Sequence, residues 1–89
     1  MGKLIRGRDP ESDYSFVIHK VFRSDRVDDQ NTMDLMIITW TRCGRPVLEK
    51  RRVWHGKKGG SKLKKLVGMN SDDLKFISDN MIEVLSLLK

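Results

Sequence analysis

The sequence predicts an α+β fold, a curved four-stranded antiparallel sheet followed by one C-terminal helix in the order β-β-β-β-α. Three observations predict it. Four segments rich in β-branched and aromatic residues are separated by turn-forming residues, a helix-start signal follows the fourth, and the C-terminal residues are apolar at helical spacing. The 89 residues suffice for one small domain, and small cores are often extended by oligomerisation.

Residues 1–13 are polar and are predicted to form a flexible basic arm that precedes a folded domain over 14–89. The first strand is predicted over 14–23 (YSFVIHKVFR), where apolar residues alternate. A turn-rich acidic loop, 24–32, leads to the second strand, 33–42 (MDLMIITWTR). This strand is apolar on both faces at its centre, which is typical of a central strand.

A hairpin turn over 43–46 follows, with Gly44 able to adopt positive φ. The third strand is predicted over 47–54 (VLEKRRVW) and is half exposed, because neither of its faces is purely apolar. The Gly- and Lys-rich segment 55–62 is predicted to be a loop and 63–69 a short fourth strand.

Asn70 or Ser71 is the expected N-cap of the helix, and the acids Asp72 and Asp73 occupy its first turn. Apolar residues then recur at helical spacing to Leu88. The apolar stripe is wider than one contact face requires, so we expect the helix to meet both its own sheet and a second protomer. The expected dimer-interface residues are Ile77, Met81, Val84, Leu85 and Leu88. The helix is expected to close one face of the sheet and to leave the other face to solvent or to a ligand.

Positive charge is concentrated in one part of the chain. Residues 42–65 contain ten Lys or Arg and a single acid, Glu49, whereas residues 23–34 contain four acids and two bases. The net charge of the chain is +6 and its sequence pI is about 9.8. Such polarisation favours an anion-binding surface over a scattered solvated face, and nucleic acid is the leading candidate partner.

Trp54 ends the basic strand. Side chains alternate along a strand, so Lys50 and Arg52 share the face of Trp54 and Arg51 does not. Cations contact phosphates and aromatic rings stack on unpaired bases, so this face is typical of a single-strand-binding surface. Trp40 is a second candidate stacking ring, although its apolar neighbours favour a position in the core.

The chain resembles the positive cofactor four family of transcriptional coactivators, whose members bind single strands. The resemblance covers roughly residues 33–88. It consists of a strand, a Gly-containing hairpin, a strand ending in KRRVW (50–54), a Gly- and Lys-rich loop, and KKLVGMNSDDL (64–74) running into an apolar helix. It implies a homodimer whose helices form the interface and whose curved sheets provide channels for single-stranded DNA.

Carried over by position, the resemblance makes Trp54 a base-stacking residue and Lys64 and Lys65 phosphate contacts. It also implies that Arg42 and Arg45 correspond to the basic residues of the family's hairpin. PUR-type repeats share the β-β-β-β-α order and bind single strands too, so RNA is an alternative ligand.

The sequence therefore predicts a non-enzymatic, largely sequence-independent single-stranded DNA-binding protein, acting as a transcriptional cofactor or in replication or repair. The expected nucleic-acid-binding residues are Arg42, Arg45, Lys50, Arg52, Trp54, Lys57, Lys58, Lys62, Lys64 and Lys65. The alternative from another class is a protein-interaction or dimerisation module whose basic face binds an acidic protein. Charge alone does not separate the two.

Neither a metal site nor a cofactor is expected, since His19, His55 and Cys43 lack the spacing of a zinc site. The segment KKGGSK departs from the Walker phosphate-binding pattern. With no nucleophile and base pair evident, the chain is not expected to be an enzyme. One cysteine and no long apolar run favour an intracellular location without a membrane span: the nucleus in a eukaryote, the cytoplasm or nucleoid in a bacterium or phage.

Overall fold

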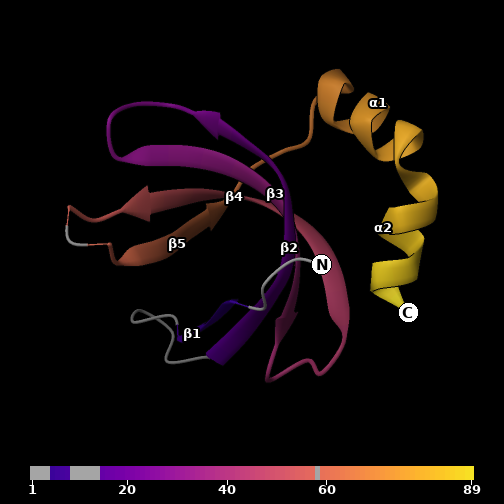
Figure 1. The fold of residues 1–89 in the computed structure, drawn as a ribbon, viewed down its shortest axis with the longest axis horizontal. Coiled ribbons are helices and arrows are strands. Elements are labelled where there is room, and N and C mark those ends of the chain that lie inside the picture. The colour runs from indigo at the N-terminus through magenta and orange to yellow at the C-terminus, as the bar shows by residue number, and fades with distance from the viewer. Residues whose placement is uncertain (1–4, 9–14, 58) are drawn as a thin grey trace.

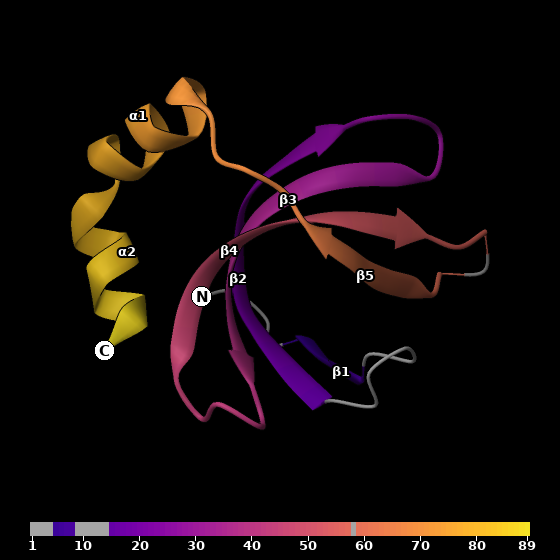
Figure 2. The same ribbon diagram turned by 180° about the vertical axis from the view of Figure 1, so that it is seen from behind.

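The computed structural model describes residues 15–57 and 59–89, together with the backbone of residues 5–8. One antiparallel sheet has the strand order β1-β2-β3-β4-β5, so each strand pairs with the next along the chain. The strands are β1 (Ile5–Arg8), β2 (Ser15–Arg26), β3 (Asn31–Trp40), β4 (Pro46–His55) and β5 (Ser61–Leu66), and the helices are α1 (Ser71–Asp79) and α2 (Met81–Leu88). The sheet is strongly curved, and both helices lie on its convex side (Figures 1 and 2).

The α+β class, the four predicted strands and the helical C-terminus are present, and β3 is the central strand of the sheet. One strand was not expected. Ile5–Arg8 falls within the predicted flexible arm, yet it forms β1 and pairs with β2 in the register Ile5↔Ile18 to Arg8↔Ser15. The alternation in 14–23 indicated a strand but carried no sign of the partner that would extend the sheet at this edge.

The concave face of the sheet holds the hydrophobic core. The buried cluster consists of Phe16, Ile18, Met36, Ile38 and Val53, with Val21, Trp40 and Leu63 packed against it. The other face of β3 presents Leu35 and Ile37, which are also fully buried. The sheet therefore curls around its own core on one side and is covered by helices on the other. The expectation that the face opposite the helix is left to solvent or a ligand is wrong.

β2 departs from simple alternation. Its register with β3 shifts between Ile18 and Lys20 and again between Val21 and Arg23. Each irregularity changes which side of the sheet the following side chain faces. Val21 therefore joins the concave core, whereas the ring of Phe22 makes an edge contact with Phe76 of α1, with centroids 6.0 Å apart. Simple alternation from Phe16 and Ile18 would put Phe22 on the core face and Val21 on the other face.

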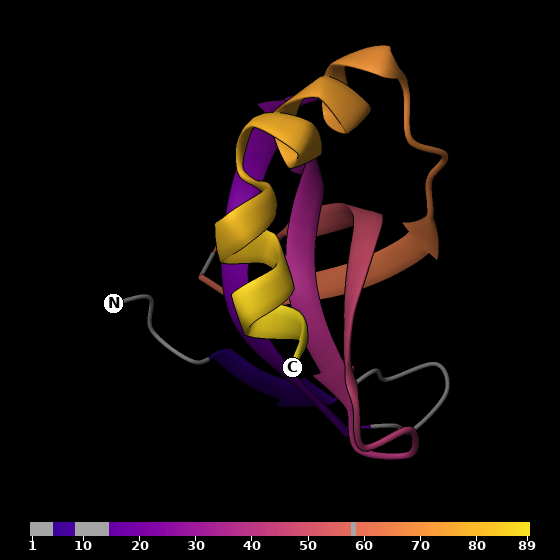
Figure 3. The same cartoon turned by 90° about the vertical axis from the view of Figure 1, so that its right-hand side faces the viewer.

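The predicted single helix is divided at Asn80, so its extent as one element is wrong. Asn80 has φ −120° and ψ 24°, outside the helical range, and its side-chain amide donates to the carbonyl of Phe76 at 2.9 Å. Asn competes with the helical backbone for hydrogen bonds in this way. The chain bends there (Figure 3), and α2 restarts with Val84 N–H donating to Asn80 O at 3.0 Å.

Ion pairs join the helices to the convex face of the sheet. Lys50 Nζ lies 2.6 Å from Asp73 Oδ2, and these side chains are only 6% and 2% exposed. Arg23 also approaches Asp73, at 3.5 Å, and Lys20 contacts Glu83 at 2.6 Å. Asp73 further completes a reciprocal capping box with Asn70. The start of α1 is thus fixed electrostatically above β4.

In the described part of the chain, no helix has the length and apolar character needed to cross a membrane.

Candidate nucleic-acid interface

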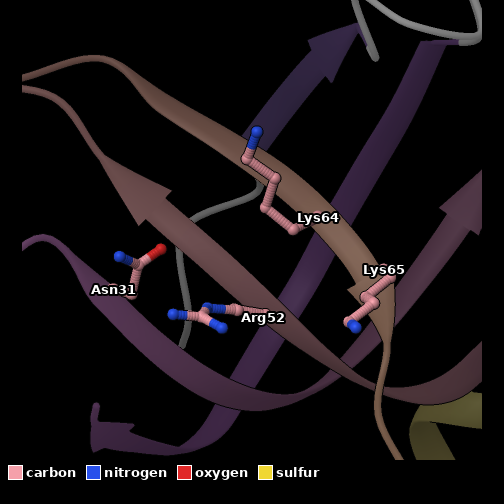
Figure 4. Close-up of a pocket in the computed structure, with 4 residues that line it drawn as sticks. All are labelled: Asn31, Arg52, Lys64 and Lys65. Atoms are coloured by element: carbon pink, nitrogen blue, oxygen red, sulfur yellow. The ribbon is translucent and has the colours of Figure 1, made fainter. Parts of the chain in front are cut away.

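A cationic pocket lies on the outer face of β3, β4 and β5. Asn31, Arg52, Lys64 and Lys65 line it (Figure 4). Arg52 pairs with Met33 of β3, which places it on the side of the sheet opposite the core. The pocket is open and has a volume of about 410 Å³, within the range of sites for small ligands. Its charged groups can therefore approach an anion from several directions while remaining solvated.

A β-bulge in β5 explains why two successive lysines line the same pocket. Arg51 pairs with Leu66 and Val53 pairs with Leu63, so two residues, Lys64 and Lys65, lie opposite Arg52. In a regular strand consecutive side chains point to opposite faces, and a bulge of this kind re-aims one of them. We call these three residues the cationic triad, Arg52, Lys64 and Lys65.

Arg51 supports the bulge from the other face. Its Nη1 donates to the carbonyl oxygen of Lys64 at 2.9 Å, and its Nε donates to Glu49 Oε1 at 2.7 Å. The sequence placed Arg51 on the face opposite Arg52, and the register of β3 and β4 agrees. Arg51 is therefore a structural residue of the site and is turned away from the pocket.

Trp54 extends the surface along β4. It lies directly opposite Asn31 of β3 and Lys62 of β5, and Lys62 Nζ is 5.6 Å from the centre of its ring. The ring also lies against Gly56, where a Cβ atom would come within 3.1 Å of it. A glycine at this position lets the partly exposed indole pack closely against the start of the loop.

An acid lies beside the pocket, next to Arg52. Asp28 Oδ2 of the β2–β3 turn lies 3.6 Å from Arg52 Nη2. Hydrogen bonds from the Asn31 side chain and the Gln30 N–H, with a smaller contribution from the charge of Arg52, hold the pKa of the Asp28 carboxyl below its ordinary value of 3.8. Asp28 is thus ionised at neutral pH beside the residue best placed to bind a phosphate.

Lys50 shares the face of Arg52 and Trp54 as expected, but the helices cover its part of that face. Its ammonium group is buried against Asp73, so it does not reach the surface that carries the cationic triad. The alternation of side chains identified the correct face, and the docking of α1 decided which part of it is exposed. We remove Lys50 from the candidate interface.

The basic hairpin lies far from the pocket. Arg42 and Arg45 are exposed beyond the start of β4, and Trp54 is near its end. Arg52 is the seventh residue of β4, so the pocket begins about 20 Å along the strand at roughly 3.3 Å per residue. Lys57 is exposed in the β4–β5 loop, near Trp54. Lys58 lies outside the described residues.

Trp40 belongs to the core side of the sheet. Its ring is 5.3 Å from that of Phe16, and the Arg51 guanidinium covers it at 4.9 Å. Its indole N–H points to both oxygens of Glu49, at 3.3 Å each. These contacts support the core interpretation that its neighbours in sequence favoured.

Two residues of the site were missed from the sequence, Asn31 and Asp28. Both lie in or beside the acidic turn, which looked like an ordinary connection. The signal that could have found them is the β3–β4 register, which sets Asn31 opposite Trp54. The register between two β-strands cannot be read from the residue pattern of either strand alone.

His55 bridges three strands at this end of the sheet. Its Nε2 lies 2.8 Å from Thr32 Oγ1 and its Nδ1 lies 3.2 Å from Ser61 Oγ. The described residues contain no group of three or more His, Cys, Asp or Glu side chains placed to hold a metal ion.

Comparison of the chain with family models, curated proteins and solved structures gave no match. The resemblance to the positive cofactor four family therefore stays a prediction from the sequence pattern.

Proposed function

We propose that this protein is a non-enzymatic, largely sequence-independent binder of single-stranded DNA, with RNA as the alternative ligand. The observation that carries the proposal is that Arg52, Lys64 and Lys65 line one open pocket (Figure 4), on the face of the sheet that also carries the partly exposed ring of Trp54. Three cations can follow a flexible phosphate backbone, and the indole offers a stacking surface to an unpaired base. None of these groups reads base edges in a fixed geometry, so little sequence preference is expected.

The proposed contact surface differs from the one that the resemblance implies. The concave face is filled by the core, so the strand would pass over the outer face of β4 and β5. Its contact residues are Asn31, Arg52, Trp54, Lys62, Lys64 and Lys65, with Lys57 at the loop. A role in transcription, replication or repair would follow from such binding, and a protein with an acidic surface remains the alternative partner.

Fluorescence anisotropy with a labelled oligothymidine of about 20 nucleotides tests the proposal, with matched duplex as competitor. We expect tight binding that survives duplex competition and weakens steeply as salt rises. Binding should also quench the fluorescence of Trp54. This is measured in the variant Trp40→Phe, in which Trp54 is the one remaining tryptophan. Binding that duplex removes equally well, without quenching, would contradict the proposal and favour a general polyanion or acidic-protein surface.

We further propose that the protein is a homodimer that uses the outer side of its helices. Val84 is buried within the protomer, so it is no interface residue, whereas Ile82 is 89% and Leu85 52% exposed. Leu74 and Met81 are also large exposed apolar residues of these helices. Large exposed apolar side chains gathered on two consecutive helices are typical of an interaction surface.

The variant Ile82→Glu/Leu85→Glu tests the dimer. Both side chains are exposed, so we expect the fold to persist and sedimentation to show a monomer where the wild type is dimeric. Lys75→Glu, an exposed position of α1 with the same total change in charge, should leave the dimer intact. A monomeric wild type at every concentration would contradict the proposal.

A further inference from the structure

The β2–β3 turn holds a carboxylate in a fixed place at the rim of the cationic pocket. Asp28 Oδ1 accepts hydrogen bonds from the N–H groups of Gln30 and Asn31, both at 2.8 Å. The Asn31 side-chain amide donates to both Asp28 oxygens, at 2.9 and 3.0 Å. Asp28 cannot turn away from the pocket without breaking these bonds, so its charge is a permanent part of the site.

The turn itself is braced around Asp28. The N–H groups of Val27 and Asp28 both donate to Asn31 O, and Arg26 Nε donates to the carbonyl oxygen of Asp28 at 3.2 Å. Arg26 also pairs with Asp29 at 3.0 Å. Asp29 therefore has Arg26 as its ion-pair partner, whereas the carboxylate of Asp28 faces Arg52.

A phosphate in the pocket needs the same guanidinium that Asp28 contacts. Both partners are part exposed, and an ion pair exposed to water is weak because solvent screens it. Phosphate and carboxylate therefore compete for one guanidinium, and a phosphate that approaches Arg52 is also repelled by the fixed charge of Asp28 beside it. Lys64 and Lys65 have no such acidic partner among the contacts of the described residues.

We propose that Asp28, which stays in place, is an internal competitor for phosphate at Arg52: it withholds the guanidinium from a bound strand and so lowers the affinity of the site. The proposal rests on the proposed function, because it concerns the same pocket. It goes beyond that function by assigning a specific opposing role to a residue of the acidic turn.

Asp28→Asn tests this role, because Asn keeps the Oδ1 acceptor that the turn needs and loses the charge. Recovering one phosphate contact steepens the slope of log K against log salt by about 0.7 for single-stranded DNA. At 0.1 M salt this corresponds to a gain in affinity of roughly fivefold. We therefore expect about fivefold tighter oligothymidine binding and a slope steeper by about 0.7. In an Arg52→Gln background the same substitution should have almost no effect.

Asp29→Asn is the matched control. It makes the same change in net charge one residue away, at a side chain that is almost fully exposed and pairs with Arg26. We expect its effect to be small. Equal gains from both variants would show that net charge alone is at work, and weaker binding by Asp28→Asn would show that Asp28 orients Arg52. Either result overturns the proposal.

Calorimetric titration of the same variants with inorganic tripolyphosphate separates this proposal from the proposed function. If oligothymidine fails to bind but tripolyphosphate binds Asp28→Asn more tightly than wild type, the competitor role stands and single-strand binding fails. If oligothymidine binds wild type and Asp28→Asn equally, single-strand binding stands and the competitor role fails. If neither ligand binds either protein, both proposals are overturned.

Discussion

Replacing Asp73 by Ala is expected to cost about 3–5 kcal/mol of the free energy of unfolding, because the buried Lys50 ammonium loses its partner. A domain of this size has a total of about 5–15 kcal/mol, so the variant should lose a large fraction of its stability. Urea denaturation followed by circular dichroism measures the difference. The same substitution also removes half of the capping box that begins α1.

Asp72→Ala is the control, since Asp72 lies in the same first turn but is exposed. It should cost no more than about 1 kcal/mol, from the helix dipole. The double variant Lys50→Met/Asp73→Leu should regain much of the lost stability, because apolar residues can replace a buried pair. Equal losses for Asp72→Ala and Asp73→Ala would refute a stabilising buried pair.

The pH dependence of this difference has a definite sign. Burial alone raises the pKa of the Asp73 carboxyl, but hydrogen bonds from Lys50 and Asn70, with the charges of Lys50 and Arg23, outweigh it and hold the pKa below 3.8. A lowered folded-state pKa contributes stability above pH 3.8 that is lost as the pH falls through the folded value. The gap between wild type and Asp73→Ala should therefore shrink below pH 3.8.

Neutralising both bulge lysines, in Lys64→Gln/Lys65→Gln, is expected to weaken oligothymidine binding about 25-fold at 0.1 M salt. The figure follows from two lost phosphate contacts, each worth about 0.7 in the salt slope and roughly fivefold in affinity at that concentration. The slope should become shallower by about 1.4. Anisotropy titrations at several salt concentrations give both quantities.

The matched control is Arg42→Gln/Arg45→Gln, which removes the same charge at the far hairpin. We expect a change of no more than about twofold, because beyond a Debye length of about 10 Å at 0.1 M salt exposed charges are largely screened. If the two double variants weaken binding equally, the ligand follows the length of β4, as the sequence resemblance implies, and the pocket is not the centre of the site.

Four of the five strands could be predicted because each of those four carries its own signal, whereas β1 carries none. β-branched and aromatic residues mark β2 and β3, and alternation correctly placed Lys50, Arg52 and Trp54 on one face. Irregularities within strands carry no such signal. The shifts in β2 that exchange Val21 and Phe22, and the bulge that turns Lys64 and Lys65 to one pocket, depend on the partner strand.

Burial of charge was equally invisible in the sequence. Asp73 was correctly placed as a helix-start acid and Lys50 as a cation beside Arg52. Their meeting at 2.6 Å depends on how the 67–70 connection returns α1 to the convex face. A local pattern specifies the face of a strand, whereas only the tertiary arrangement specifies which part of that face is covered.

The bulge in β5 has a consequence for colloidal behaviour. β5 is an outer strand of the sheet, and a regular, uncharged outer strand can recruit strands from other molecules. Here an irregular backbone and the side chains of Lys62, Lys64 and Lys65 discourage such pairing through twist and mutual repulsion. The lysines proposed to bind a strand of nucleic acid thus also protect the protein from polymerising with itself. Variants in which these lysines are replaced by neutral residues should therefore be most prone to self-association when no polyanion is present.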